Sequence, residues 1–342
     1  MADVARLAGV STQTVSRVLN DYEFIKAGTR DRVLHAIDSL DYRPNIAART
    51  LATKRSRTIG VVVTDYLSYG PATALWGVEE AAREGGYGVS IVSLRESSFH
   101  TMTEALVRLA GQGVEGIILI APQDANVQAA FESFASLPVV TFSGFASADY
   151  RPVMLDSAEG SRIATRYLIE LGHRTIMHLA GPEQFTVSES RIRGWRDALA
   201  EAGLPASEPI VGDWTAESGY EVGKQIATNL NATAAYVAND RMAQGLLLAL
   251  HEAGRRVPED FSVVGFDDVP EAAYLIPPLT TIRQDLTALG RRCIEAVIAL
   301  INGDPPIEPE PLIPNLIIRA STGPVPCGPA IKVPRAPDRR CA

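Results

Sequence analysis

The sequence predicts an α/β protein with an all-helical head followed by a two-lobe core of doubly wound parallel sheets. Three observations support this fold. The first 42 residues hold only short helical patterns, whereas residues 58–268 hold seven apolar runs separated by amphipathic segments. Nearly continuous apolar strands that alternate with helices are typical of a parallel sheet covered on both faces. About 265 residues of this pattern is large for one sheet, so we expect two lobes with a ligand cleft between them.

Composition narrows the function classes. Residues 1–57 carry ten lysines and arginines against six acidic residues, a net charge of +4, whereas the remainder carries −12. A basic head on an acidic body indicates that the head meets a polyanion. The three cysteines form no C-x-x-C pair, which favours free thiols in a reducing compartment. No apolar run approaches 18 residues and no signal-like segment is present, so we expect a cytoplasmic protein without a membrane partner.

The head contains three helical patterns, of which the second carries the chemistry. They span Asp3–Ala8, Thr12–Leu19 and about Thr29–Leu40, with Asp3, Ser11 and Thr29 as residues of N-cap type. At 100° per residue, one arc of the second helix holds Thr12, Gln13, Ser16 and Arg17. The opposite side holds Thr14, Val15, Val18 and Leu19, which we expect to pack on Val4, Leu7 and Ala8, with Gly9 at the sharp turn.

This polar arc matches the needs of base recognition. Glutamine pairs with two atoms of adenine and arginine with two of guanine in the major groove. The second helix of a helix-turn-helix presents such side chains in its first turns. An ordinary polar helix face is the alternative, which the turn and the basic charge disfavour.

A short segment after Arg43-Pro44-Asn45 predicts a hinge. Ala47, Ala48 and Leu51 form a narrow apolar stripe on a helix of about two turns, which is too short to be stable alone. Two copies in a dimer could enter the minor groove and kink it, with Leu51 as the wedge. Taken alone, such a stretch is usually a linker. Directly after a helix-turn-helix, it favours a hinge helix that contacts DNA.

The core strands follow from the apolar runs. They lie at residues 58–65, 88–94, 116–122, 138–144, 175–181, 234–240 and 261–268. Residues 324–342 contain five prolines and no periodicity, which predicts a disordered tail.

Four residues near predicted strand ends suit a sugar site. Trp214 offers a flat face to a pyranose ring, and Arg191 can donate two parallel bonds to a vicinal diol. Asn239 and Asp267 close apolar strands, and α/β sheets bind ligands at the carboxyl ends of strands. Each has a structural alternative: a core tryptophan, a surface ion pair, a turn residue and a helix N-cap, respectively.

These motifs together resemble one family. ADVARLAGVSTQTVSRVLN and YRPNIAARTLAT resemble the DNA-binding head and hinge of the LacI/GalR repressors. LGHRTIMHLAGP, RIRGW, GDWTAESGY, YVANDRMAQG, FSVVGFDD and IPPLTTIRQDL follow in the family's order, so the likeness covers residues 2–322. It implies a core like that of periplasmic binding proteins and a homodimeric repressor of carbohydrate-utilisation genes. Double-stranded operator DNA and a saccharide effector, such as a galactoside, are the implied partners, and no cofactor is implied.

The resemblance also implies residue roles. Thr12, Gln13 and Arg17 would read bases, Leu51 would intercalate beside Ala48, and the expected phosphate or backbone contacts are Asn20, Thr29 and Asn45. The implied effector contacts are Gly70, Pro71, Arg191, Trp214, Asn239, Asp267 and Gln284.

This chain departs from the family at four places. Ser143 stands where a member has an aspartate that binds sugar hydroxyls, and Leu286 where it has an aromatic residue. The tail lacks a leucine heptad, which predicts a dimer. The family usually has a few more residues before the first helix, which leaves open whether the working start is Met1 or lies upstream.

The expected domains follow these boundaries. The head spans 1–44, the hinge and linker 45–57, the core 58–322 and the tail 323–342. Within the core, 58–156 and 286–322 are assigned to the first lobe and 157–285 to the second.

Other motifs and function classes are disfavoured. Gly111–Gly116 spells G-x-G-x-x-G but precedes a strand, and His173 and His178 lack a third metal ligand, so we expect a turn residue and a partly buried histidine. Asp267 and Asp268 are adjacent on a strand and point apart, so they form no acid/base pair. We predict no catalytic and no metal-binding residues. A solute-binding protein would need a signal peptide and no head, and a carbohydrate-active enzyme would need two carboxylates in the cleft.

Overall fold

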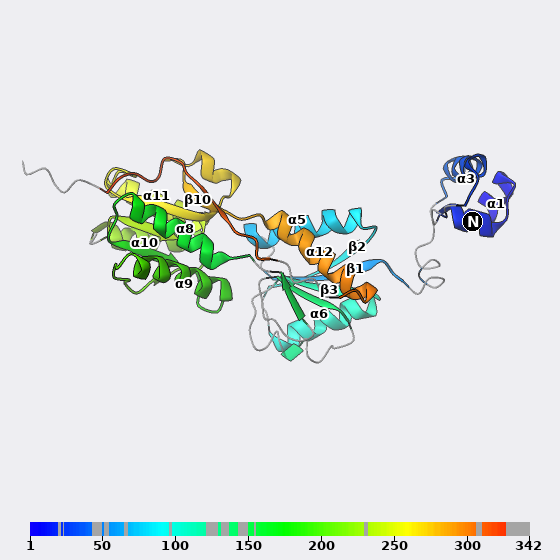
Figure 1. Ribbon diagram of the computed structural model, residues 1–342, viewed down its shortest axis with the longest axis horizontal. Coiled ribbons are helices and arrows are strands. Elements are labelled where there is room, and N and C mark those ends of the chain that lie inside the picture. Colours follow the sequence, from blue (N-terminus) through cyan, green and yellow to red (C-terminus); the bar gives the residue numbers. More distant parts are fainter. Residues whose placement is uncertain are drawn as a thin grey trace, which may run out of the picture. The chain divides into compact units, whose positions relative to one another are not determined.

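The computed structural model describes residues 1–19, 22, 24–42, 50, 55–64, 68–95, 98–120, 129–130, 137–142, 150–153, 155–228, 232–305 and 310–325. The chain forms two compact units, a head unit of residues 1–57 and a core unit of residues 58–342 (Figure 1). The elements of the head unit are α1 (Ala2–Ala8), α2 (Thr12–Leu19) and α3 (Ala27–Ser39).

The head unit is held by a small aliphatic core. Its buried members are Val4, Ala5, Ala8, Val15, Val18, Val33 and Ala36. The predicted packing of α2 on α1 is correct except at Leu7, which is 57% exposed because Ala5 occupies the inward position of that turn. Gly9 ends α1 in the left-handed conformation with φ 63°, as the predicted sharp turn requires.

Only one of the three expected N-caps is correct. Ser11 Oγ accepts a hydrogen bond from Thr14 N at 3.1 Å. Asp3 lies inside α1, which starts at Ala2, and pairs with Arg6 instead. Thr29 lies inside α3, whose N-cap position is Lys26 without a side-chain cap. Both helices begin earlier than their polar residues suggested, because a helix can start without a side-chain cap when water satisfies its first N–H groups.

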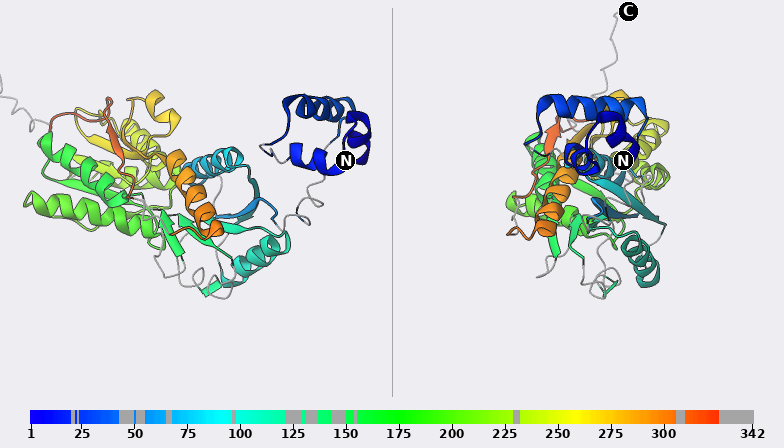
Figure 2. Two further views of the ribbon diagram at one scale, coloured as in Figure 1. Left: turned by 45° about the vertical axis from the view of Figure 1, so that its right-hand side comes forward. Right: turned by 90° about the vertical axis from the view of Figure 1, so that its right-hand side faces the viewer.

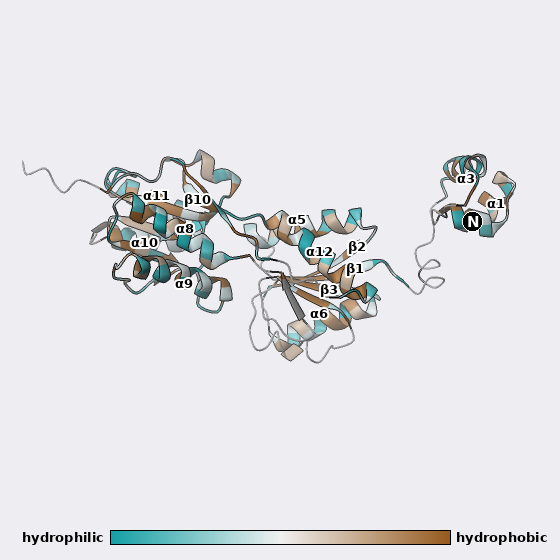
Figure 3. Cartoon of the chain, viewed as in Figure 1, coloured by the Kyte–Doolittle hydropathy of each residue, from teal (hydrophilic) through white to brown (hydrophobic). Residues whose placement is uncertain are grey.

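The core unit contains two sheets, each covered on both faces. The first sheet has the order β2-β1-β3-β4-β5 and the second β11-β10-β9-β8-β6-β7. The strands are β1 (Thr58–Thr64), β2 (Gly88–Leu94), β3 (Gly116–Ile120), β4 (Val139–Phe142), β5 (Tyr150–Val153), β6 (Ile176–Ala180), β7 (Ile210–Val211), β8 (Ala234–Val237), β9 (Ser262–Asp267), β10 (Thr280–Arg283) and β11 (Asn315–Ile317). Pairing is parallel in both sheets except between β10 and β11. Figure 3 shows the hydrophobic strands inside each lobe and polar stripes on the covering helices.

The helices sort by the two faces of each sheet. They are α5 (Tyr69–Glu84), α6 (Phe99–Gly111), α8 (Ser157–Glu170), α9 (Thr186–Glu201), α10 (Ala216–Thr228), α11 (Asp240–Glu252), the 3-10 helix η1 (Pro270–Tyr274) and α12 (Leu286–Asn302). In the first lobe, α5 and α12 share a core with one face of the sheet, and α6 covers the other face (Figure 2). In the second lobe, α10 and α11 cover one face, and α8 and α9 cover the other. The seven predicted strands are all present, whereas β5, β7, β10 and β11 were not among them.

The sequence-based lobe assignment needs one correction. Residues 286–322 were assigned to the first lobe, and α12 does pack there. However, β11 pairs with β10 in the second sheet, and Leu316 packs on the core of that lobe. The chain therefore returns to the second lobe after Leu312, which still contacts the first core and bridges to Leu155.

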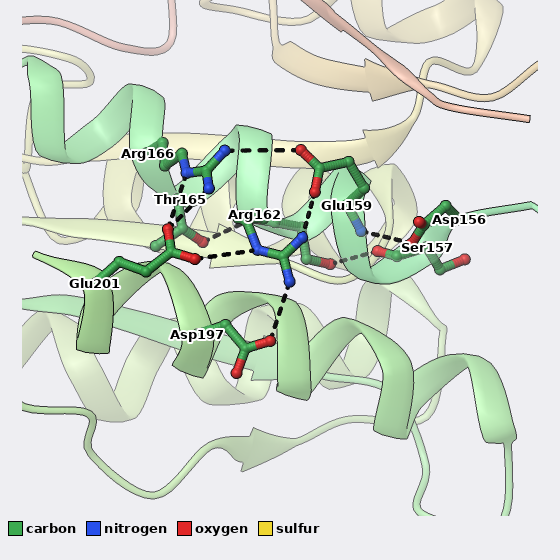
Figure 4. Close-up of polar contacts among 9 residues, drawn as sticks. Asp156, Ser157, Glu159, Arg162, Thr165, Arg166, Asp197 and Glu201 are labelled. Carbon is green, nitrogen blue, oxygen red and sulfur yellow. Dashed lines mark hydrogen bonds and ion pairs between the residues drawn. The ribbon is translucent and has the colours of Figure 1, made fainter.

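An ion-pair network joins α8 to α9 on the second lobe. Arg162 pairs with Glu159 on its own helix and with Asp197 on α9, where the Nη2–Oδ2 distance is 3.1 Å (Figure 4). Arg166 reaches Glu201 at 2.8 Å. Networks of this kind stabilise more than isolated surface pairs do, because each arginine serves several carboxylates. The network joins α8 to α9, the helix that carries Arg191 at the site described next.

Candidate functional site

The polar arc of α2 lies on the surface of the head unit. Thr12, Gln13 and Arg17 are exposed, Ser16 is half-buried, and Val15 and Val18 face the core. The arc thus has the arrangement that the sequence predicted. The Arg17 guanidinium lies 5.3 Å from the centre of the Tyr22 ring.

Of the other predicted DNA contacts, Thr29 is half-buried on α3. Asn20, Asn45, Ala48 and Leu51 lie outside the described residues, so the hinge stays a prediction.

A pocket in the core unit gathers the predicted ligand residues. It encloses about 1070 Å³ of space between atoms, part of it open to solvent. Gly70, Pro71, Arg191, Trp214, Asn239, Asp267 and Gln284 all line it; Ser143 lies outside the described residues. Thr64, Ile120, Phe142 and Asp267 end β1, β3, β4 and β9, so the pocket lies at the carboxyl ends of the strands in both sheets.

Arg191 is the central cation of the pocket. It is 5% exposed, and its guanidinium stacks on Phe266 with 3.9 Å to the ring centre. Nη1 donates to the Ala238 carbonyl, Nη2 lies 3.8 Å from Asp267 Oδ1, and Nε has no partner among the described residues. A buried arginine that keeps an unused donor is costly unless a ligand or water satisfies it.

Asp267 faces this arginine from the end of β9. Gln284 Nε2 donates to Asp267 Oδ1 at 2.7 Å. Burial raises the pKa of the Asp267 carboxyl to about 6, and the Arg191 guanidinium opposes part of that rise. The predicted alternative of an N-cap is wrong for Asp267, which begins no helix. Asp267 is the one carboxylate among the described lining residues.

Asp240 lies beneath the pocket rather than in its lining. Its two oxygens accept from Thr281 Oγ1 at 2.6 Å and from Val269 N at 2.9 Å. Burial raises its pKa well above the ordinary value, and the nearby Asp267 charge adds to the effect. These bonds attach the start of α11 to β10 and to the segment after β9.

Trp214 is held by three contacts. Its ring meets Phe185 edge to face at 5.9 Å and lies 5.6 Å from the Arg191 guanidinium. Its carbonyl accepts from Asn239 Nδ2 at 3.0 Å, while Asn239 Oδ1 caps α11 at Met242 N. The ring covers Gly181 so closely that a Cβ there would lie 2.1 Å from it. Asn239 is therefore both a helix cap and a pocket residue.

Backbone strain collects in the same region. Trp214 has φ 72°, Asp267 φ 114° and Asp268 φ 56°, three of the five non-glycine residues with positive φ in the described part of the chain. Such conformations cost energy and persist where surrounding contacts impose them, often at ligand sites. Asp268 points away from the pocket and pairs with Arg283 and Arg319, both at 2.6 Å, so adjacent Asp267 and Asp268 form no acid/base pair.

The histidines are more buried than the sequence suggested. His173 and His178 both have 0% exposure, so the expectation of a partly buried His178 is wrong. Burial lowers the pKa of His178 to about 3, and its ring stacks on Tyr236 at 4.6 Å. Among the described residues no group of three His, Cys, Asp or Glu side chains could hold a metal ion. Cys293 is a buried free thiol whose pKa burial raises to about 12.

Sequence reasoning missed part of the pocket. Tyr69, Phe142, Phe185 and Arg241 also line it. Phe142 ends a predicted strand, and Arg241 follows Asn239 by two residues, so the rule of strand carboxyl ends points to both. Tyr69 and Phe185 begin or precede helices and carry no comparable signal.

Two family models match the chain. Residues 1–45 match the bacterial regulatory proteins of the lacI family, and residues 165–322 match a periplasmic binding protein-like domain.

The chain is similar to curated repressors along most of its length. It is 33% identical to the lactose operon repressor of Escherichia coli (strain K12), over 94% of this chain and 89% of the repressor. It is 35% identical to the HTH-type transcriptional repressor PurR of Vibrio campbellii, over 87% of this chain and 91% of PurR.

The chain is also similar to solved structures along most of its length. A Lac repressor dimer bound to operator and the anti-inducer ONPF gives a TM-score of 0.83 at 32% identity, covering 94% of this chain and 98% of that one. The complex of the transcriptional regulator CelR with cellobiose gives 0.70 at 31% identity, covering 93% and 98%.

Proposed function

The chain belongs to the LacI family of DNA-binding transcriptional regulators, and we propose that it represses carbohydrate-utilisation genes until a saccharide releases it from its operator. One observation carries this proposal: the chain holds an exposed base-reading arc on α2 and, in a separate unit, a pocket that combines an aromatic face with a buried arginine. Relatives similar over most of its length are repressors rather than enzymes.

The chemistry of the pocket supports a saccharide. The half-buried Trp214 ring offers an apolar face to the C–H side of a pyranose. Arg191 and Asp267 provide a donor and an acceptor for neighbouring hydroxyls. The similar CelR structure is a complex with cellobiose, which supports a sugar as the class of ligand.

Release would work through a coupling free energy between the two units. The pocket is lined by both lobes, and β1 of the first lobe begins at Thr58, directly after linker residues 55–57. A ligand that favours one arrangement of the lobes therefore changes the geometry at the linker. Couplings of about 1–3 kcal/mol are typical, and they change DNA affinity about 5- to 150-fold.

A homodimer suits an operator with two half-sites. A hollow on the second lobe supports it, because two apolar side chains in its lining are exposed: Ile276 is 93% exposed and Leu248 51%. The hollow is lined by Ala216, Glu217, Tyr220, Gln244, Gly245, Leu247, Leu248, His251, Leu275 and Ile276. Exposed apolar side chains in such a hollow are costly in water, and a second copy of the chain would cover them.

The site of action would be the cytoplasm, where operator DNA is found. None of the helices in the described part of the chain is both long and apolar enough to cross a membrane. The alternatives on the same two-lobe core are a solute-binding protein and a carbohydrate-active enzyme. Periplasmic fractionation tests the first, and turnover of a chromogenic glycoside tests the second.

Fluorescence anisotropy with DNA from the gene's own upstream region tests the proposal. Salt is held fixed, because phosphate contacts make affinity steeply salt-dependent. We expect binding to a palindromic site that one saccharide of a panel weakens. The Gln13→Ala variant should lose about 1–3 kcal/mol of discrimination against scrambled DNA, whereas Gln112→Ala at the end of α6 should match the wild type. Equal binding of operator and scrambled DNA would contradict it.

A further inference from the structure

One charged residue of the pocket, Arg241, is not among the sugar contacts described above. The ionisable side chains among its described lining residues are Tyr69, Arg191, Arg241 and Asp267. Burial raises the pKa of Tyr69, which therefore stays neutral. Two guanidinium groups thus face one carboxylate, and the pocket carries a net positive charge.

Arg241 is not neutralised by its surroundings. It is the second residue of α11, is exposed, and forms no ion pair or hydrogen bond with any residue that the structure describes. The adjacent Asp240 already accepts from Thr281 and Val269, and Asp268 is occupied by Arg283 and Arg319. The nearby carboxylate that senses Arg241 is Asp267, whose pKa it lowers slightly.

The position of Arg241 is also unfavourable for the helix. Positive side chains destabilise the first turn of a helix, where the macrodipole is itself positive. The carboxyl that would offset this effect, Asp240, is buried, and its pKa is raised well above the ordinary value. A cation and a helix N-terminus therefore present the same sign of charge to the pocket, and this combination attracts an anion.

A second observation points to a ligand with strong acceptor atoms. Only 5% of the Arg191 surface is exposed, and its Nε has no hydrogen-bond partner among the described residues. Its other nitrogens contact the Ala238 carbonyl and, at 3.8 Å, Asp267. The pocket region thus contains one unsatisfied N–H donor, on the buried Arg191, and one unpaired charge, on the exposed Arg241.

We propose that the effector is an anionic saccharide, whose carboxylate or phosphate group binds Arg241 while its ring packs against Trp214 and its hydroxyls contact Arg191. This inference rests on the proposed function of the same pocket and specifies its ligand class. Carboxylate and phosphate share the chemistry that a guanidinium recognises, namely two acceptor oxygens that match its paired donors.

Isothermal titration calorimetry with matched ligand sets tests the inference. The sets are glucose, glucuronate and glucose 6-phosphate; galactose, galacturonate and galactose 6-phosphate; and cellobiose with cellobionate. Each is titrated into the wild type, Arg241→Gln and the control Arg193→Gln, which removes an exposed arginine of α9 outside the pocket. DNA anisotropy with the same ligands gives a second readout.

We expect one acid or phosphate to bind at least about 10-fold more tightly than its neutral parent. Arg241→Gln should abolish that preference, whereas Arg193→Gln should keep it. Within a set, whether the acid or the phosphate binds more tightly separates a carboxylate from a phosphate.

Two results would overturn the inference and leave the proposed function intact. One is a neutral sugar that binds and weakens DNA binding as well as its charged partners do. The other is a charged preference that survives Arg241→Gln. If no ligand of any set binds or affects DNA, both the inference and the saccharide effector are rejected.

Discussion

The two walls of the pocket differ in kind. The second lobe supplies the charged and amide groups, among them Arg191, Asn239, Arg241 and Asp267. The first lobe supplies mainly apolar or small residues, such as Pro71, Ile120 and Phe142. The difference indicates a division of labour: the second wall chooses and orients a polar ligand, and the first wall excludes water and sets the shape. Changes to the second wall should therefore alter stability, affinity and pH dependence, and changes to the first should have smaller effects.

The largest expected effect is on stability, at Asp267. Burial raises its pKa from 3.8 to about 6, so the folded protein holds the charged form less well than the unfolded chain does. The free energy of unfolding is therefore unaffected by this group below pH 4. As the pH rises through about 6, the group lowers the free energy of unfolding by about 3 kcal/mol. Asp267→Asn should remove this loss, and asparagine tolerates positive φ. Urea unfolding should find the variant more stable at pH 7.5 and similar at pH 4.

A matched control has the opposite sign. The half-buried Asp260 pairs with Arg256, which lowers its pKa to about 2, so its contribution is present above pH 4 and is lost as the pH falls. Asp260→Asn should therefore destabilise the protein at pH 7.5 and have little effect near pH 2. An Asp267→Asn variant that is less stable than wild type at pH 7.5 would contradict the account of the second wall.

The next effect concerns Arg191, the buried cation that the second lobe supplies to the pocket. Arg191→Lys keeps the charge but loses the planar fork, so saccharide affinity should fall about 10- to 100-fold, or about 1.4–2.8 kcal/mol. Calorimetry measures this, with Arg196→Lys on the exposed side of the same helix as control. If both variants bind equally, Arg191 does not recognise the ligand.

A smaller effect should follow from moving the aromatic face. In Gly181→Ala the new methyl group would overlap the Trp214 ring, which must shift. Displacement of the ring should weaken saccharide binding about 10-fold, detectable by fluorescence titration. The control is Gly111→Ala, where the new methyl group meets open space and the backbone needs no positive φ. Gly203→Ala would be unsuitable, because Gly203 has a φ of 67°. Unchanged affinity in Gly181→Ala would remove Trp214 from the recognition wall.

The smallest effect is expected on the first wall. Ile120→Val removes one methylene group from a buried strand end and should cost about 1 kcal/mol of stability. Its effect on saccharide affinity should stay below about threefold, since no hydrogen bond is lost. A larger drop in affinity, measured by the same calorimetry, would show that the first wall also discriminates between ligands.

Much of this architecture was predictable because its signals are local. Apolar runs as strong as Ile59–Val63 or Ile117–Ile120 become central strands. The α2 arc and seven of the eight predicted pocket residues follow from helical periodicity, strand ends and family resemblance. By contrast, β10 and β11 have four and three residues, and Asn315 and Pro314 interrupt any pattern near the second. Their pairing is decided by a chain crossing between lobes, which no local signal encodes.

The strand-end rule points to the place of Arg241 in the pocket, but its unpaired charge could not be predicted from the sequence. An arginine next to an aspartate at a helix start looks like a local ion pair in the sequence. In the structure, Asp240 turns inward to Thr281 and Val269, and these contacts come from residues 29 and 41 positions away.

The most direct test of the central claim is reciprocal linkage between the two units. Saccharide affinity is measured by calorimetry for the free protein and for the protein saturated with operator, at one salt concentration. If the pocket controls the head, operator-bound protein should bind the saccharide more weakly, by the same factor of about 5 to 150 by which the saccharide weakens DNA binding. Equal saccharide affinity in the two states would contradict the claim that this pocket regulates DNA binding.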